Sequence, residues 1–209
     1  ERIDGMGWMF NDTDSYLLKY SGDNKKLLDV LSIVLKTFDN SIKEVVPIDP
    51  ASPDSILIRF SNGQSVVYHN GEFAGKNILS KGTESGISIA EILTSIIEHL
   101  YGFYYCDEKF CFVQSDLEIR ILSLMIDALG KDEQLIFTTH NSDVLKLNLP
   151  KHSFTFLRKT DHIEAINAGD YLKKQSDSLK NAVENDAFSA LPDFSELNNK
   201  LEELIDEKV

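Results

Sequence analysis

The sequence predicts an α/β fold: a mostly parallel sheet with flanking helices, a β-hairpin and a C-terminal helical tail. Two short apolar runs predict it, one closed by Asp107 and Glu108 and the other by Thr139 and His140, with a helical pattern between them. Such spacing is typical of a β-helix-β unit in a parallel sheet. Because ligands gather at the carboxyl ends of parallel strands, we expect these polar groups to emerge at one edge and form a site.

Composition limits the function classes. The 209 residues are 42% hydrophobic and carry a formal net charge of -13. This charge disfavours binding of nucleic acid over the whole surface, since phosphate contacts need clustered Lys and Arg, but a local basic patch or a basic partner stays open. Cys106 and Cys111 show neither a zinc spacing nor a disulfide framework, which favours a cytoplasmic location. No run approaches a membrane span, so no membrane partner is expected.

The chain divides into three predicted parts. We interpret residues 1–20 as a truncated connector, residues 21–168 as the main domain and residues 169–209 as a helical tail. The tail carries ten acidic residues against five lysines, which is typical of a solvated helical face. Because the chain starts at Glu1 without an initiator Met, we interpret it as part of a longer chain.

The N-terminal half predicts scaffold elements. Apolar residues recur at helical spacing over residues 23–38, and strands are expected on both sides of Asn62-Gly63, a pair preferred where both turn residues need positive φ. The stretch Gly71–Asn77 looks like a phosphate loop, but it has three residues between its glycines where the pattern needs four, and Asn77 replaces the Ser or Thr. We therefore reject it, and no other stretch supplies a phosphate loop.

A polar turn precedes the next helix. Ser80, Gly82 and Thr83 come before an apolar helical face that includes Ile89, Leu93 and other residues up to Leu100. Backbone amides, hydroxyls and the positive end of the helix dipole could together bind an anion there. Ser and Thr also cap most helices, so a plain cap explains the same residues.

In this order and spacing, the motifs resemble the ABC-type ATPases of the SMC, RecF and OLD class, closely over residues 78–145. The resemblance identifies Leu79–Thr83 with the signature motif, Phe103–Glu108 with the Walker B strand, Ser115–Leu117 with the D-loop, and His140 with the switch histidine. The Walker A half has no counterpart in this sequence. The fold that the resemblance implies is the C-terminal part of an ABC-type ATPase lobe.

The resemblance also implies roles and cofactors, namely ATP and Mg²⁺. Asp107 would hold the metal through water, Glu108 would orient or deprotonate the attacking water, and His140 would sense the γ-phosphate. Two chains would close over two ATP molecules as a homodimer or a higher homo-oligomer. The residues expected to contact nucleotide are Ser80, Gly82, Thr83, Ser115 and Asp116.

Each motif has a plainer explanation. Asp107 and Glu108 could lie in a solvated loop, and His140 could precede a helix start at Ser142. Ser115 with Glu118 three residues later forms a capping box whether or not the segment is a D-loop.

After Glu108 the sequence KFCFVQSDLE resembles the Septu-type defence ATPases called PtuA, although Gln114 stands where a histidine is expected. The resemblance implies an ATPase that regulates an effector nuclease, HNH-type and PtuB-like, in bacterial antiphage defence. Nucleic acid would be reached through the complex. A DNA repair ATPase of the RecF or SMC type and a scaffold with a decayed nucleotide site remain alternatives.

Downstream patterns predict strands over residues 153–158 and 162–166 that continue the sheet, a helix over residues 169–184 and a final helix from Ser195. No second acidic cluster follows His140. This argues against a fused Toprim nuclease of the OLD type.

Overall fold

The computed structural model describes residues 6–9, 22–49, 52–69, 72–74, 79–173, 178–190 and 193–206. The chain forms a mixed α/β structure that divides into two compact units, Glu1–Val144 and Leu145–Val209. The rejected phosphate-loop stretch lies mostly outside the described residues.

A three-stranded parallel sheet carries the edge predicted from the sequence. Its strands are β1 (Met6–Met9), β6 (Phe103–Asp107) and β7 (Gln134–Thr138), with β6 in the centre. Both pairings are parallel, and α3 (Ser115–Ala128) connects β6 to β7, which confirms the predicted β-helix-β unit. Strand β1 was not predicted, because the expected connector over residues 1–20 shows no clear apolar period.

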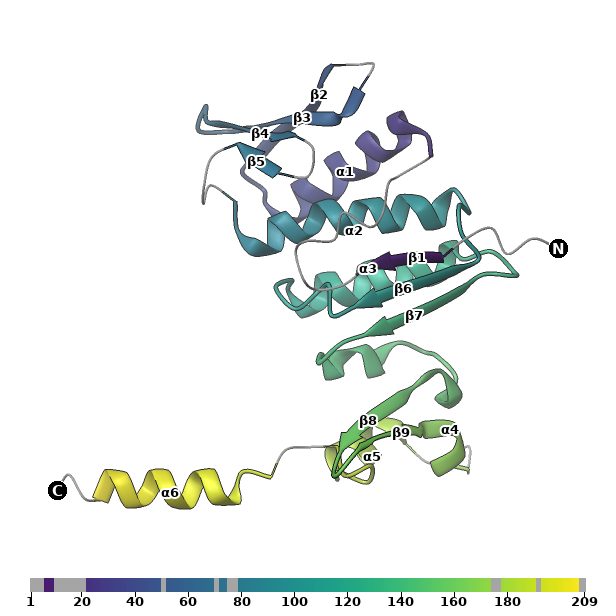
Figure 1. The fold of residues 1–209 in the computed structure, drawn as a ribbon, viewed down its shortest axis with the longest axis vertical. Coiled ribbons are helices and arrows are strands. Elements are labelled where there is room, and N and C mark those ends of the chain that lie inside the picture. Colours follow the sequence, from purple (N-terminus) through teal and green to yellow (C-terminus); the bar gives the residue numbers. More distant parts are fainter. Residues whose placement is uncertain are drawn as a thin grey trace. The chain divides into compact units, whose positions relative to one another are not determined.

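The central helix of the first unit is α2 (Lys81–Ile97), which lies beside α1 (Asn24–Phe38) in Figure 1. Asp23 caps α1 by accepting a hydrogen bond from the Lys25 amide at 2.8 Å. The predicted apolar faces of both helices are buried in one core, together with Tyr104 and Cys106 of β6, whose exposure is 0%. The Tyr104 hydroxyl also donates a hydrogen bond to the Ser95 carbonyl of α2 at 2.9 Å, so α2 and β6 are connected by this bond as well as by the shared apolar core.

The strands between α1 and α2 form a separate sheet. They are β2 (Ile42–Asp49), β3 (Ser52–Phe60), β4 (Ser65–His69) and β5 (Glu72–Ala74), paired antiparallel in this order. The expectation of a mostly parallel sheet is therefore not confirmed. At most four residues separate each of these strands from the next along the chain. So short a connection can only reverse the chain direction, whereas parallel strands need a long crossover.

The β3–β4 hairpin is confirmed, but its turn differs from the expected one. Gly63 has a φ of +86°, while Asn62 is not among the described residues with positive φ. The Gly63 amide donates to the Phe60 carbonyl at 3.1 Å, and the Phe60 amide donates to Gln64 at 2.9 Å. This three-residue loop places only its glycine in the left-handed region, as a type I turn with a bulge does.

The second unit contains a two-stranded antiparallel sheet, β8 (Thr155–Lys159) with β9 (Ile163–Asn167). These strands pair with each other and not with β7, so the expectation that they continue the parallel sheet is wrong. The short turn between them again allows only antiparallel pairing. Phe188 is buried and stacks on Phe156 with ring centroids 4.2 Å apart.

The predicted helix over residues 169–184 is also wrong as a single element. The structure has α4 (Ala168–Tyr171) and α5 (Leu179–Glu184), each with its own polar cap, Asn167 and Ser178. A cap side chain that bonds a backbone amide starts a new helix, so the two remain separate.

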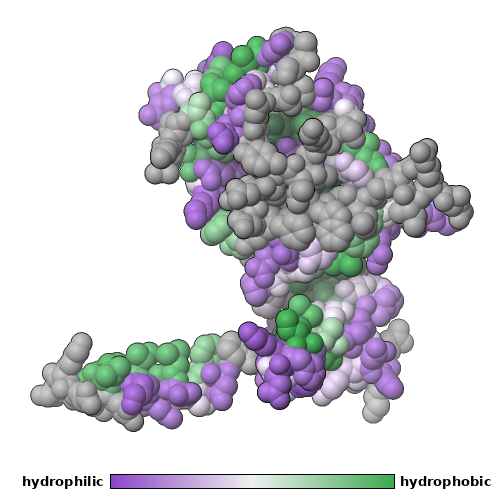
Figure 2. Space-filling model, in the orientation of Figure 1, coloured by the Kyte–Doolittle hydropathy of each residue, from purple (hydrophilic) through white to green (hydrophobic). Residues whose placement is uncertain are grey.

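The final helix is confirmed as α6 (Ser195–Asp206). Two short 3₁₀ helices, η1 (Ser142–Lys146) and η2 (Lys151–Ser153), precede β8 in the chain. One side of α6 is apolar and exposed (Figure 2), and includes Leu197, Leu201 and Leu204. No helix among the described residues is long and apolar enough to span a membrane.

Candidate functional site

The site begins where β6 and β7 end. Their register places Asp107 opposite Thr138, so the residues that follow each strand emerge at the same edge, as predicted. The Thr138 hydroxyl donates a hydrogen bond to Asp107 Oδ1 at 2.7 Å and accepts one from the Glu108 amide at 3.0 Å. This threonine therefore fixes both the Asp107 carboxylate and the start of the next residue.

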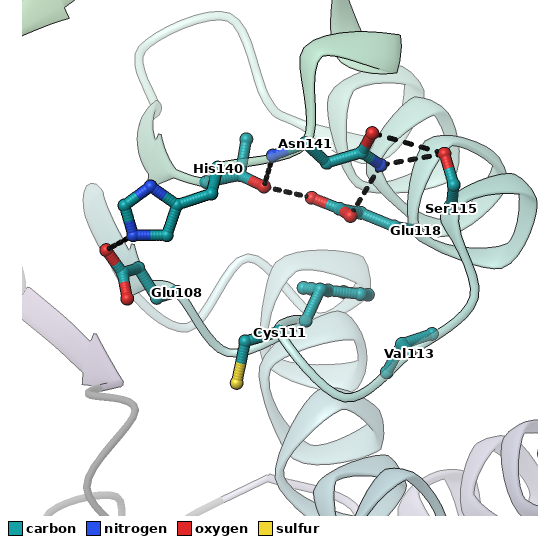
Figure 3. A pocket seen from close by; sticks show the side chains of 9 residues that line it. Glu108, Cys111, Val113, Ser115, Glu118, His140 and Asn141 are labelled. Atoms are coloured by element: carbon teal, nitrogen blue, oxygen red, sulfur yellow. Dashed lines mark hydrogen bonds and ion pairs between the residues drawn. The ribbon is translucent and has the colours of Figure 1, made fainter. Parts of the chain in front are cut away.

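Glu108 and His140 form an ion pair across this edge. His140 Nε2 lies 2.7 Å from Glu108 Oε1, as Figure 3 shows, and the two side chains are 84% and 35% exposed. Glu108 has a φ of 47°, in the left-handed region that residues with a Cβ rarely adopt. Backbone strain of this kind is concentrated at functional sites, where the surrounding structure maintains it.

A pocket of about 270 Å³ opens beside the pair. Its lining includes Glu108, Cys111, Ser115, Glu118, His140 and Asn141 (Figure 3). These residues come from the segment after β6, the first turn of α3 and the segment after β7, so the pocket combines the three predicted motif regions. Its mouth carries a carboxylate and an imidazole, which together can accept and donate protons.

A second polar cluster lies at the back of this pocket. The buried Glu118 carboxylate accepts a hydrogen bond from the Thr139 hydroxyl at 2.6 Å and another from Asn141 Nδ2 at 2.7 Å. The Ser115 hydroxyl donates to Asp143 at 2.7 Å and accepts from Asn141 Nδ2 at 2.9 Å. The first turn of α3 is thereby bound to the segment that carries His140.

The expected capping box at Ser115 and Glu118 is wrong. The N-cap of α3 is Gln114, which makes no side-chain cap hydrogen bond, so Ser115 is already inside the helix. Its hydroxyl and the Glu118 carboxylate bond the segment after β7 instead.

From the sequence, Glu118 is predicted only as part of a capping box, and Asn141 and Thr138 are not predicted to belong to the site. The helical spacing of Glu118 could have indicated that it is buried, because it lies on the same face of α3 as the buried Ile121, Leu122 and Met125. A carboxylate at an apolar position needs hydrogen-bond partners when it is buried. That requirement points to polar neighbours at the back of a site.

The polar turn expected before the helix is the N-terminus of α2 itself: Ser80 is the N-cap, and Gly82 and Thr83 already lie inside the helix. The Ser80 side chain caps α2 by accepting from the Thr83 amide at 3.1 Å, and Thr83 is 2% exposed. Gly82 packs on the segment after β6, where an added Cβ would lie 2.7 Å from the Phe112 carbonyl oxygen. The pocket lining contains none of Ser80, Gly82 and Thr83, and their nucleotide-binding role stays a prediction.

Of the two predicted D-loop residues, only one lines the pocket. Ser115 lines the pocket and belongs to the polar cluster, whereas Asp116 is exposed. Their contact with nucleotide also stays a prediction.

The residues at the edge fit a magnesium ion held mainly by water and phosphate. Asp107 offers one carboxylate oxygen beyond the one that Thr138 occupies, and Mg²⁺ is commonly bound by one or two carboxylates plus substrate phosphates. Within the described parts of the chain, no group of three or more His, Cys, Asp or Glu side chains could hold a metal ion.

Among known proteins, similarity to this chain is found only with solved structures. No family model and no curated protein matches the sequence. Three solved structures of SMC head domains are similar to this chain. The first is bound to the C-winged helix domain of ScpA; it has 14% identity and a TM-score of 0.45, covering 70% of this chain and 44% of its own. A second, from Pyrococcus yayanosii, has 15% identity and a TM-score of 0.45, covering 71% of this chain and 29% of its own. A third, from Pyrococcus furiosus, has 13% identity and a TM-score of 0.44, covering 71% of this chain. This chain spans less than half the length of each of these structures.

Proposed function

We propose that this chain supplies the hydrolytic edge of an ABC-type ATPase. The observation that carries the proposal is the convergence of Asp107, Glu108 and His140 at the carboxyl edge of β6 and β7, with the imidazole paired to Glu108 at 2.7 Å. A metal-binding carboxylate, a carboxylate base and an imidazole at one edge are groups that can bind Mg²⁺, activate water and donate to a phosphate.

Each residue has a defined task in this proposal. Asp107, oriented by the Thr138 hydroxyl, would hold the water shell of Mg²⁺, which supplies charge neutralisation at the phosphates. Glu108 would position the attacking water and accept its proton. His140 would donate a hydrogen bond to the γ-phosphate when it leaves Glu108, so that the present ion pair is the resting arrangement of the site.

The proposal needs a phosphate-binding loop from outside this sequence. Catalysis of phosphoryl transfer is mostly positioning and charge stabilisation, and no stretch here has the spacing of such a loop. Dimer closure would bring Ser80 and Gly82 of one copy to the nucleotide of another. A homodimer or a higher homo-oligomer is therefore the proposed working form.

We assign the ATPase to regulation of an effector nuclease, HNH-type and PtuB-like, in bacterial antiphage defence. The support is the segment KFCFVQSDLE after Glu108, which resembles the Septu-type ATPases. In the structure this segment forms the wall of the pocket and the start of α3, so a partner that shifts it would act directly on the site.

The test measures ATP hydrolysis by the intact protein, with Glu108→Gln and His140→Ala variants, with and without DNA. Loss of a general base typically costs 10²–10⁴-fold, so we expect kcat to fall at least about a hundredfold in Glu108→Gln while ATP still binds. His99→Ala is a matched control, because His99 pairs with Glu133 outside the pocket lining at 3.1 Å.

Unchanged turnover in Glu108→Gln would refute the assignment. Strong stimulation of wild-type ATP hydrolysis by DNA would favour a DNA repair ATPase. If the wild type neither bound nor hydrolysed ATP, the protein would instead be a scaffold with a decayed nucleotide site.

A further inference from the structure

Glu118 is a buried carboxylate without a role in the proposed hydrolytic step. It is 3% exposed, although Asp and Glu are seldom buried without a partner. Both of its oxygens accept hydrogen bonds, Oε1 from the Thr139 hydroxyl and Oε2 from Asn141 Nδ2. These donors are the residues immediately before and after His140 in the sequence. Figure 3 shows the Asn141 side chain directed at the Glu118 carboxylate.

Besides Glu118, the segment that carries His140 is held by the Ser115 hydroxyl, which bonds Asn141 and Asp143, and by the pair between His140 and Glu108. It follows the last residue of β7 and has its own local bonds, from the Asn141 amide to Thr139 Oγ1 at 3.0 Å and from the Asp143 amide to Asn141 Oδ1 at 3.0 Å. The exposed His140 side chain contributes no burial that would hold it in place. The hydrogen bonds to Glu118 connect this turn to α3, a helix fixed in the core by Ile121 and Met125.

We infer that Glu118 is a positioning residue that holds the Thr139–Asn141 turn and thereby sets the His140 imidazole against Glu108. Its carboxylate is suited to this task because a charged acceptor binds hydroxyl and amide donors about twice as strongly as a neutral one. The Ser115 hydroxyl supports the same turn through Asn141 and Asp143. A shift of the first turn of α3 would therefore move His140. The expected effect on ATP hydrolysis rests on the proposed function, whereas the expected loosening of the Thr139–Asn141 turn does not.

The first experiment measures amide hydrogen exchange of residues 139–143 in the wild type, Glu118→Gln and Glu133→Gln. Glutamine keeps the shape but loses the charge and one acceptor, so we expect the Asn141 and Asp143 amides to exchange about tenfold faster in Glu118→Gln. Glu133→Gln is the matched control, because Glu133 is also a little-exposed carboxylate but bonds Gly130 and His99. Unchanged exchange in Glu118→Gln would overturn the inference whether or not the protein hydrolyses ATP.

The second experiment is a double-mutant cycle on ATP hydrolysis by the intact protein. Misplacing a catalytic group costs up to about a hundredfold, so we expect Glu118→Gln to lower kcat roughly ten- to hundredfold. The KM for ATP should stay within about twofold, because ground-state binding is untouched. If Glu118 acts through His140, the same change should have no further effect in a His140→Ala background. Additive losses would overturn the inference, and an inactive wild type would refute the proposed function instead.

A pair of variants at Thr139 keeps the test decisive if Glu118→Gln does not fold. Thr139→Val removes the donated hydrogen bond at nearly constant shape, whereas Thr139→Ser retains it. We expect faster exchange and slower turnover in the valine variant and rescue of both in the serine variant. Equal behaviour of the two would contradict a positioning role.

Discussion

The His140 imidazole pairs with the Glu108 carboxylate at 2.7 Å because the parallel register of β6 and β7 ends both strands at one edge. Glu108 adopts a left-handed backbone conformation there, and its amide bonds both the carbonyl and the hydroxyl of Thr138. The pairing thus depends on one strained residue that is fixed by its neighbour strand.

The strain at Glu108 predicts a difference between two substitutions that both remove the carboxylate. Glu108→Gly should be more stable than Glu108→Ala by about 1 kcal/mol, because only glycine adopts a φ near 47° without a Cβ penalty. Urea denaturation of both variants measures this difference, and both should be inactive. A more stable alanine variant would show that the left-handed conformation is not retained.

Gly82 is predicted to tolerate no Cβ. An added Cβ would lie 2.7 Å from the Phe112 carbonyl oxygen, and a backbone atom cannot move aside as a flexible side chain can. We expect Gly82→Ala to lower the free energy of unfolding by about 1–3 kcal/mol, the usual cost of overpacking. Ser85→Ala, on the next turn of α2, is the control and should change it by less than about 0.5 kcal/mol.

Stability should fall with pH because of Glu91 on α2. Burial raises the pKa of this carboxyl from 4.5 to about 7, and attraction by Lys109 offsets part of the rise. The folded state therefore retains a proton that the unfolded state releases. The free energy of unfolding should decrease between about pH 4.5 and 7, by up to about 3 kcal/mol, and level off above.

Replacement by glutamine isolates this effect. Glu91→Gln removes the titrating group, so its stability relative to the wild type should increase from pH 5 to pH 8. Urea denaturation across this range measures it. A constant difference between the two proteins would contradict a raised pKa.

The two cysteines should differ in reactivity. Cys111 is exposed at the pocket, whereas Cys106 is buried in β6, where desolvation raises the pKa of its thiol to about 12. Because the thiolate is the nucleophile, iodoacetamide should modify Cys111 in the native protein and Cys106 only after unfolding. Mass spectrometry of digested samples identifies the modified thiol. Native modification of Cys106 at a comparable rate would show that β6 opens readily.

Alkylation of Cys111 should also inhibit ATP hydrolysis, because the added group enters the pocket that Glu108 and His140 share. A Cys111→Ser variant should be active and insensitive to the reagent.

Several features of the site were predictable because they depend on neighbours in the sequence. Helical spacing predicted α2, although this helix begins at Lys81 and so includes Gly82 and Thr83, and apolar runs predicted β6 and β7. Once two parallel strands with a connecting helix are expected, the geometry of the unit places Asp107, Glu108 and His140 at one edge. The contact between Glu108 and His140 was not predicted, because it depends on the side-chain conformations in the folded structure.

The tertiary structure alone decided what depends on pairing between distant segments. Strand β1 is identified by its hydrogen bonds to β6, since its own residues show no period. The strands from β2 to β5 pair antiparallel because their turns are short, and β8 pairs with β9 and not with β7.

The same division holds within the site. The sequence by itself determined the residues at the mouth of the pocket, because strand ends and helix starts follow from local pattern. Glu118 was assigned to a local cap, yet the fold brings the segment after β7 within hydrogen-bond distance of its buried carboxylate. A buried charge is stabilised by whichever donors the fold places beside it, and only the tertiary structure decides which those are.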